Sequence, residues 1–99
     1  MESTIAVRIE KKKLLDLKAV SKEENKKNSE VLREVLDLGL KEKKITLAID
    51  KYRKREISIG KAAEIADVSI SRLMDILRER NVPFNYGAKE LMEDFEGFI

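Results

Sequence analysis

The chain has 99 residues, of which 42% are hydrophobic and 40% are charged. A chain of this length forms one domain or two very small modules, and so much charge leaves little apolar surface for a large core. Because the sequence contains neither cysteine nor histidine, it cannot build a disulfide, a thiolate zinc site or a histidine-based catalytic group. We therefore expect no catalytic residue, no metal and no cofactor, and we expect that the protein is not an enzyme.

The basic residues are concentrated in the first two thirds of the sequence. Residues 8–27 include eight basic and four acidic side chains, and residues 41–61 include eight basic and three acidic ones. From residue 62 onward the balance reverses to four basic and eight acidic side chains. The first two thirds therefore suit a polyanion such as nucleic acid, whereas the last third suits a basic partner or none.

Nothing in the sequence has the pattern of a membrane or secretion segment. No apolar run approaches the ~20 residues that a transmembrane helix requires. No signal-peptide pattern opens the sequence, and a composition without cysteine is typical of cytoplasmic proteins. We expect a cytoplasmic protein with no membrane partner.

Residues 4–10, which read TIAVRIE, alternate between apolar and polar side chains. This period of two predicts a half-buried strand whose apolar side faces helices. No later segment has a strand pattern of comparable quality, so the backbone groups of this strand need a partner from elsewhere. Antiparallel pairing with the same strand of a second copy satisfies them, and we therefore predict a homodimer. The predicted inward side chains are Ile5, Val7 and Ile9, and the outward ones are Thr4, Ala6 and Arg8.

After the strand, helical periodicity predicts a series of helices. The second of them begins near Asn28 or Ser29 and runs to about Leu38, where Gly39 is the predicted stop. Two later helices are each capped by a serine and are separated by a turn at Asp67. The predicted ranges are 11–23, 29–38, 43–55, 59–66, 70–80 and 88–96, with a turn at 85–87.

The order strand, helix, helix over residues 3–40 resembles the ribbon-helix-helix superfamily of repressors and antitoxins. The resemblance rests on the run TIAVRI, the leucine-rich first helix, the loop ending in Asn28-Ser29-Glu30 and the helix VLREVLDLGL. It implies a homodimer whose paired strands enter the major groove of double-stranded DNA. The side chains on the bases would be Thr4, Ala6 and Arg8. Those on phosphate would be Lys26, Lys27, Asn28 and Ser29.

Residues 58–80 fit the spacing of a helix-turn-helix. A small residue, Ala63, permits a close helix crossing, and Asp67 stands at the turn where many DNA readers carry glycine. The run from Tyr52 to the end also resembles an uncharacterised family of small prokaryotic proteins that are proposed to be antitoxins. The outer face of the second helix is a candidate surface for DNA or for a partner protein, and it carries Ser71, Arg72 and Asp75.

In the last ten residues, acidic side chains are interspersed with apolar ones. In antitoxins, a C-terminal amphipathic segment typically covers the active site of a toxin protein. The resemblance therefore implies a toxin-binding tail that uses Leu91, Phe95 and Phe98.

A plainer interpretation stands beside each of these predictions. The N-terminal strand could pair with residues 82–86 of its own chain, although Pro83 disfavours this. The helix-turn-helix could be a compact scaffold that docks onto a protein, and the tail could cover the core of its own chain.

Together the patterns predict a mainly α fold in two modules. Residues 1–40 would form the ribbon-helix-helix module for dimerisation and DNA binding, through a two-stranded antiparallel ribbon between copies. Residues 41–99 would form a helical, helix-turn-helix-like module with an acidic tail. The predicted function is a homodimeric, sequence-specific transcriptional regulator that is the antitoxin of a type II toxin–antitoxin operon. The alternative is a protein-interaction module that neutralises a toxin without sequence-specific DNA binding.

Overall fold

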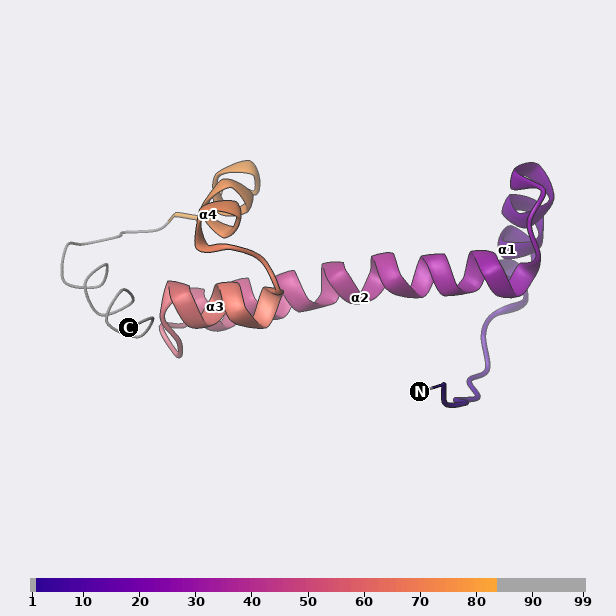
Figure 1. The fold of residues 1–99 in the computed structure, drawn as a ribbon, viewed down its shortest axis with the longest axis horizontal. Coiled ribbons are helices and arrows are strands. Elements are labelled where there is room, and N and C mark those ends of the chain that lie inside the picture. Colours follow the sequence, from indigo (N-terminus) through magenta and orange to yellow (C-terminus); the bar gives the residue numbers. More distant parts are fainter. Residues whose placement is uncertain (1, 84–99) are drawn as a thin grey trace. The chain divides into compact units, whose positions relative to one another are not determined.

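The structure is a computed structural model that describes residues 2–83. Within that range the chain forms four helices, which Figure 1 shows in order. They are α1 (Lys11–Glu24), α2 (Asn28–Arg53), α3 (Ile59–Ala66) and α4 (Ile70–Glu79). The chain divides into two compact units, Met1–Leu38 and Gly39–Ile99, and the boundary falls inside α2. The predicted turn at 85–87 and the predicted helix at 88–96 lie outside the described residues.

The prediction of an N-terminal strand, and of the ribbon-helix-helix fold built on it, is wrong. Residues 2–10 have no regular secondary structure, and the described part of the chain contains no strand. Ile5, Val7 and Ile9 were predicted to face the helices, but they expose 84%, 74% and 51% of their surface. The physical reason is that the described residues offer this segment no second strand, so its backbone N–H and C=O groups have no ladder to join. The described residues form a mainly helical chain.

Helix α2 is continuous where the sequence predicted two helices. Gly39 lies in its interior and is exposed, instead of ending it. Glycine ends a helix by adopting a positive φ, and no glycine in the described range does so. The flanking residues Leu38, Leu40 and Lys41 are strong helix formers, and they carry the helix through a glycine that costs about 1 kcal/mol relative to alanine.

The last turn of every described helix is closed in the same way. A residue one or two positions after each helix adopts a left-handed conformation, with φ between 55° and 60°. The next N–H then donates to the carbonyl five residues earlier, which satisfies an acceptor that the helix leaves free. These bonds run from Lys26 to Ser21 (2.9 Å), Glu56 to Lys51 (3.0 Å), Val68 to Ala63 (3.0 Å) and Val82 to Leu77 (2.8 Å).

The main hydrophobic core described lies in the second unit. Ile59, Leu73 and Leu77 have no exposed surface. The C-terminal half of α2 packs with α3 and α4 around them, and the segment after α4 adds Val82. The other buried members of this core are Ala48, Ile49, Ala62, Ala63, Ala66 and Ile76.

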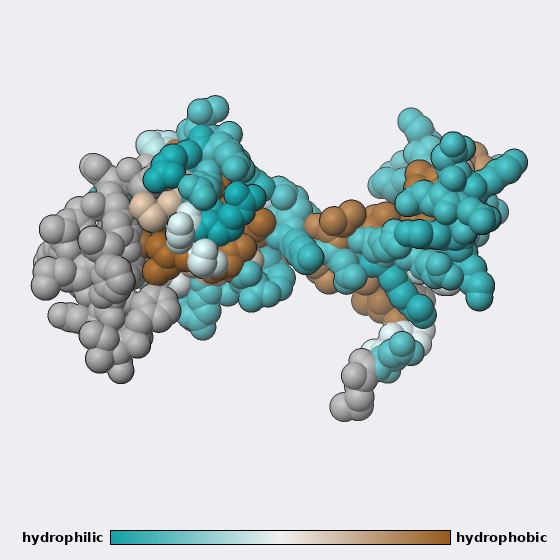
Figure 2. Space-filling model, turned by 45° about the horizontal axis from the view of Figure 1, so that its top comes forward, coloured by the Kyte–Doolittle hydropathy of each residue, from teal (hydrophilic) through white to brown (hydrophobic). Residues whose placement is uncertain are grey.

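The first unit buries far less. Among residues 2–38, the buried side chains are Val31 and Ser21. The Ser21 hydroxyl donates to the Leu17 carbonyl oxygen at 2.7 Å, so this buried polar group is satisfied. Much of the apolar surface of the unit is exposed, and Figure 2 shows it in brown over the part of α2 that follows α1.

We predict that Gly39→Ala raises the free energy of unfolding by about 0.5–1 kcal/mol, because alanine restricts the unfolded chain and stabilises a helix interior. A Cβ atom at this position would meet no other atom within 4 Å, so no clash opposes the gain. Urea unfolding followed by circular dichroism measures the change. The control is Gly39→Pro, which should destabilise the protein by about 3 kcal/mol if α2 is continuous here. A tolerated proline would show that the helix is interrupted at this point.

Candidate nucleic-acid interface

Helix α3 is a short amphipathic helix with a defined start. The Ser58 hydroxyl oxygen accepts a hydrogen bond from the Lys61 N–H at 3.1 Å, which caps the helix. Its buried side chains include Ile59 and three alanines, and such small residues allow a neighbouring helix to approach closely. The predicted helix at 59–66 is confirmed, with its serine cap.

A tight turn joins α3 to α4. Asp67, predicted to stand at this turn, adopts a left-handed conformation (φ 59°, ψ 44°). Val68 packs against the core, and Ser69 begins α4 by accepting the Arg72 N–H at 3.0 Å. The two helices and their turn therefore form the helix-turn-helix arrangement that the spacing predicted.

Helix α4 has one face fixed in the core and one face exposed to solvent. Leu73, Ile76 and Leu77 are buried on the inner face. The predicted surface residues Ser71, Arg72 and Asp75 are all exposed, and one short helix brings them together. The inner residues hold the helix in place, so the outer residues are presented on a rigid element.

The charged side chains of this outer face take part in ion pairs along the same helix. Arg72 Nη1 lies 3.4 Å from Glu79 Oε1, and Arg78 Nη1 lies 2.9 Å from Asp75 Oδ1. All four side chains are at least half exposed. Exposed pairs of this kind contribute about 0–1 kcal/mol. Arg72 can therefore exchange its contact with Glu79 for a stronger acceptor at little cost.

The described part of the second unit is basic. Residues 39–83 include eleven basic and seven acidic side chains, which gives a net charge of +4. Several of the basic residues gather at the end of α2, at Lys51 and in the run 53–55. The Lys54 ammonium lies 3.1 Å from Asp50, and its hydrogen bond to that carboxylate raises the pKa of Lys54 above its ordinary value. The Lys54 side chain is therefore positively charged at neutral pH.

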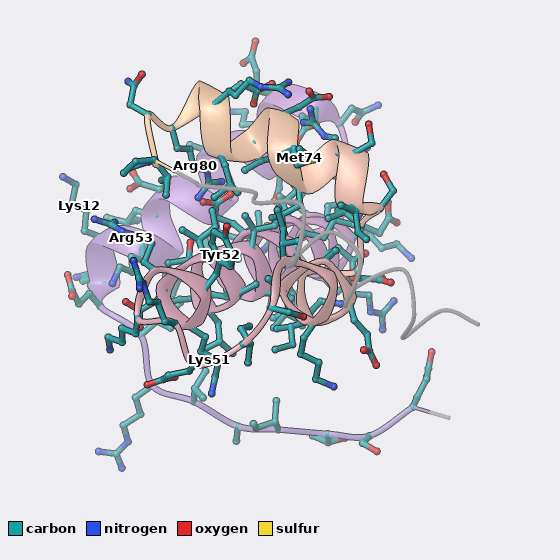
Figure 3. All side chains as sticks on the ribbon, turned by 90° about the vertical axis from the view of Figure 1, so that its left-hand side faces the viewer. Lys12, Lys51, Tyr52, Arg53, Met74 and Arg80 are labelled. Carbon is teal, nitrogen blue, oxygen red and sulfur yellow. The ribbon has the colours of Figure 1, made fainter. Side chains whose placement is uncertain are left out.

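A shallow hollow of about 260 Å³ lies between α2 and the segment after α4. Its lining includes Thr46, Asp50, Arg53 and Arg80, and Figure 3 shows both arginines near Tyr52. Arg80 donates to Glu42 at 2.9 Å. This hollow could not be predicted from the sequence, because the two arginines come from distant positions with no local signal. One arginine is already neutralised and a carboxylate stands beside the other, so the hollow has too little positive charge for a phosphate site.

The phosphate-contacting residues predicted around the start of α2 lie close in sequence and are exposed. Lys26 Nζ, however, lies 2.7 Å from Glu34 Oε1 and 3.9 Å from Glu24 Oε2. The hydrogen bond that Lys26 donates to Glu34 is the largest of the causes that raise the pKa of Lys26. Two carboxylates therefore compete with phosphate for this ammonium. Contact with phosphate stays a prediction for Lys26, Lys27, Asn28 and Ser29.

The remaining predicted contacts fall at the two ends of the chain. Thr4, Ala6 and Arg8 are exposed in the segment without regular secondary structure, and their contact with bases stays a prediction. The predicted toxin-binding residues, Leu91, Phe95 and Phe98, lie outside the described residues.

The described part of the chain shows neither a metal-binding cluster nor a membrane-spanning helix. Residues 2–83 contain no group of three or more acidic, cysteine or histidine side chains placed to hold a metal ion. None of the helices in this range is both long enough and apolar enough to cross a membrane. The described residues form a small helical protein in which two short helices, α3 and α4, are joined by a tight turn.

The chain belongs to the uncharacterised protein family UPF0175, whose family model matches residues 3–98. It is similar to a UPF0175 protein of Archaeoglobus fulgidus, with 51% identity over 55 residues. The match covers 56% of this chain and 63% of that relative, so the chain spans less than two thirds of the relative's length. No solved structure matches the chain. The predicted resemblance to an uncharacterised family is confirmed by this membership. The family description does not include the regulatory and antitoxin roles, which stay predictions.

We predict that Leu73→Ala lowers the free energy of unfolding by about 2–5 kcal/mol, because it leaves a cavity between α3 and α4. Leu73 is fully buried in the core that fixes these two helices. Thermal and urea unfolding measure the loss. Leu47→Ala is the matched control, because this leucine is half exposed and its truncation should cost much less. Equal losses in the two variants would contradict the assignment of the core.

Proposed function

We propose that the protein is a DNA-binding transcriptional regulator that reads DNA with the α3–α4 helix-turn-helix. The observation that carries the proposal is the first turn of α4, which exposes Ser71 and Arg72 while the opposite face is fixed in the core. In helix-turn-helix proteins, residues at the N-terminal end of the second helix contact base edges in the major groove. An arginine at this position can donate two hydrogen bonds to guanine, and a serine can bond to any base.

The charge of the second unit supports contact with phosphate. Its described part has a net charge of +4, with basic side chains at the end of α2 and on α3 at Lys61. Positive charge of this kind supplies the sequence-independent part of DNA affinity. Asp75 on the outer face repels phosphate, but a carboxylate can accept a hydrogen bond from the cytosine amino group. In this proposal Asp75 contributes to sequence preference and the lysines and arginines contribute to affinity.

We extend the proposal to a role as the antitoxin of a toxin–antitoxin pair. The support is the sequence of residues 84–99, which has a net charge of −3 where the preceding 45 residues have +4. An acidic segment with interspersed leucine and phenylalanine complements a basic protein surface, such as that of an enzyme acting on RNA. Leu91, Phe95 and Phe98 are the proposed apolar contacts. A regulator of this kind would repress the operon that encodes it and its toxin.

The competing function is a module that binds a protein partner through the same helices and contacts DNA only incidentally. The acidic residues on the outer face of α4 favour this alternative. The salt dependence of DNA binding distinguishes the two functions. A sequence-specific DNA reader loses affinity steeply as salt is added, yet it still prefers its own site over other DNA.

We predict that Arg72→Ala weakens binding to DNA from the protein's own promoter region by about 1–3 kcal/mol, the usual value of a bidentate base contact. Fluorescence anisotropy with a labelled duplex measures the affinity at several salt concentrations. A scrambled duplex of the same length measures the non-specific part, which should change much less.

The matched control for this experiment is Arg33→Ala, which removes an exposed arginine from the first unit. It should leave the preference for the promoter duplex unchanged. If Arg72→Ala and the wild type bound both duplexes alike, α4 would not be a reading helix. Wild-type binding without any sequence preference would favour the competing function.

We also predict that deleting residues 90–99 abolishes neutralisation of a co-expressed partner toxin and leaves promoter binding intact. The deletion removes the proposed apolar contacts and all four acidic side chains of the tail, but none of the helix-turn-helix. Growth of cells that express both proteins measures neutralisation. A deletion variant that still neutralised the toxin fully would contradict the antitoxin role of the tail.

A further inference from the structure

The first unit has an apolar face that the described residues leave uncovered. On α2, Leu32, Val35 and Leu36 are each more than half exposed. They stand at positions i, i+3 and i+4, so they form one stripe along the helix, and Figure 2 shows apolar surface over this part of α2. The remaining exposed apolar side chains on the helices of this unit are Leu14, Leu15, Val20 and Leu38.

The other side of the same stretch of α2 is charged. Glu30, Arg33, Glu34 and Asp37 are all exposed, and none of them falls within the apolar stripe. A helix with one apolar side and one charged side is typical of an element that buries the apolar side against a neighbour. The described residues provide no such neighbour, since Val31 is the buried hydrophobic residue of this stretch.

The unit is too small to be stable alone. It spans 38 residues, and below about 40 residues a fold usually needs disulfides, a metal or oligomerisation. The chain has no cysteine, and the described residues have no cluster that could hold a metal ion. Oligomerisation is the one of these three sources of stability that the sequence and the described residues do not exclude.

We propose that a second copy of this chain occupies the apolar face, so that the first unit forms a helical homodimer without any paired strands. The charge of the unit supports a second copy as the occupant. Residues 1–38 include nine basic and eight acidic side chains, a net charge of +1. Two copies therefore do not repel each other, whereas a strongly acidic or basic partner would find no complementary charge.

The apolar area also fits a second copy. At roughly 60 Å² of remaining apolar surface for each half-exposed side chain, the seven helical residues expose about 400 Å². Monomeric proteins rarely leave a contiguous apolar patch of more than a few hundred Å² uncovered. Two copies together would bury about 800 Å² of apolar surface, which is the apolar share of a stable interface of about 1,300 Å². In a two-fold dimer each copy contributes the same stripe.

The proposal does not depend on DNA binding, and a matched pair of double variants tests it. Leu32→Gln with Leu36→Gln places two amides on the apolar stripe. Arg33→Gln with Asp37→Gln makes the same change on the charged side, keeps the spacing and leaves the net charge unchanged. Sedimentation equilibrium of the full chain over a range of concentrations measures the dissociation constant of the dimer.

We expect the wild type and the charged-side variant to be dimers, with twice the mass of the 11.4 kDa chain. The apolar-stripe variant should dissociate on the order of 100-fold more readily, since it loses two buried side chains from the centre of the interface. A monomeric wild type would overturn the proposal, and so would equal weakening in both variants. If deleting residues 84–99 converted a monomeric wild type into a dimer, the tail and not a second copy would be the occupant.

A second measurement does not rely on any variant being folded. Because the dimer stabilises the first unit, the unfolding temperature of the wild type should rise with protein concentration. A single unfolding temperature over a hundredfold range of concentration would overturn the proposal even if the apolar-stripe variant failed to fold.

Discussion

The burial of Ile59, Leu73 and Leu77 is the interaction on which the described structure depends most. These side chains have no exposed surface, and they come from both helices of the helix-turn-helix. Their burial fixes α4 against α3 and against the end of α2, and it thereby determines which side of α4 faces solvent. The candidate interface follows from this constraint, because Ser71 and Arg72 lie outside the buried face of α4 and are exposed.

The two units differ in how they obtain stability. The second unit surrounds its core with helices from its own chain, and small residues such as Ala62 and Ala63 allow those helices to approach closely. The first unit buries Val31 and leaves most of its leucines and valines exposed. This difference separates the proposed roles, because a DNA-reading surface requires a rigid support and a dimer interface requires uncovered apolar surface.

Features with a local cause could be predicted from the sequence. Ser58 and Ser69 each cap a helix through their own hydroxyl, and Asp67 tolerates the left-handed turn between the helices, so residues 58–80 were predicted closely. The same helical periodicity predicted that Ser71, Arg72 and Asp75 are exposed on α4. Features that depend on competition between local preferences were predicted wrongly. Gly39 was expected to end a helix, but the helix formers around it outweigh its cost in the interior of α2.

The strand at residues 4–10 was wrong for a different reason. Alternation of apolar and polar residues shows which side a strand would bury, but a strand also needs a partner for its backbone. The described chain contains no such partner, and Val7 is exposed as a result. The hollow beside Arg53 and Arg80 could not be predicted either, because it depends on how α2 packs against α4.

Hydrogen exchange of the full chain at several protein concentrations tests the central claim most directly, namely that the second unit is stable in itself and the first unit depends on a second copy. The account predicts that amides beyond the first turns of α3 and α4 have the same protection at every protein concentration. It also predicts that amides in α1 and at the start of α2 become more protected as concentration rises, because local opening there requires dissociation. The account would be contradicted if the amides of α1 were as protected as those of α3 and their protection did not depend on protein concentration.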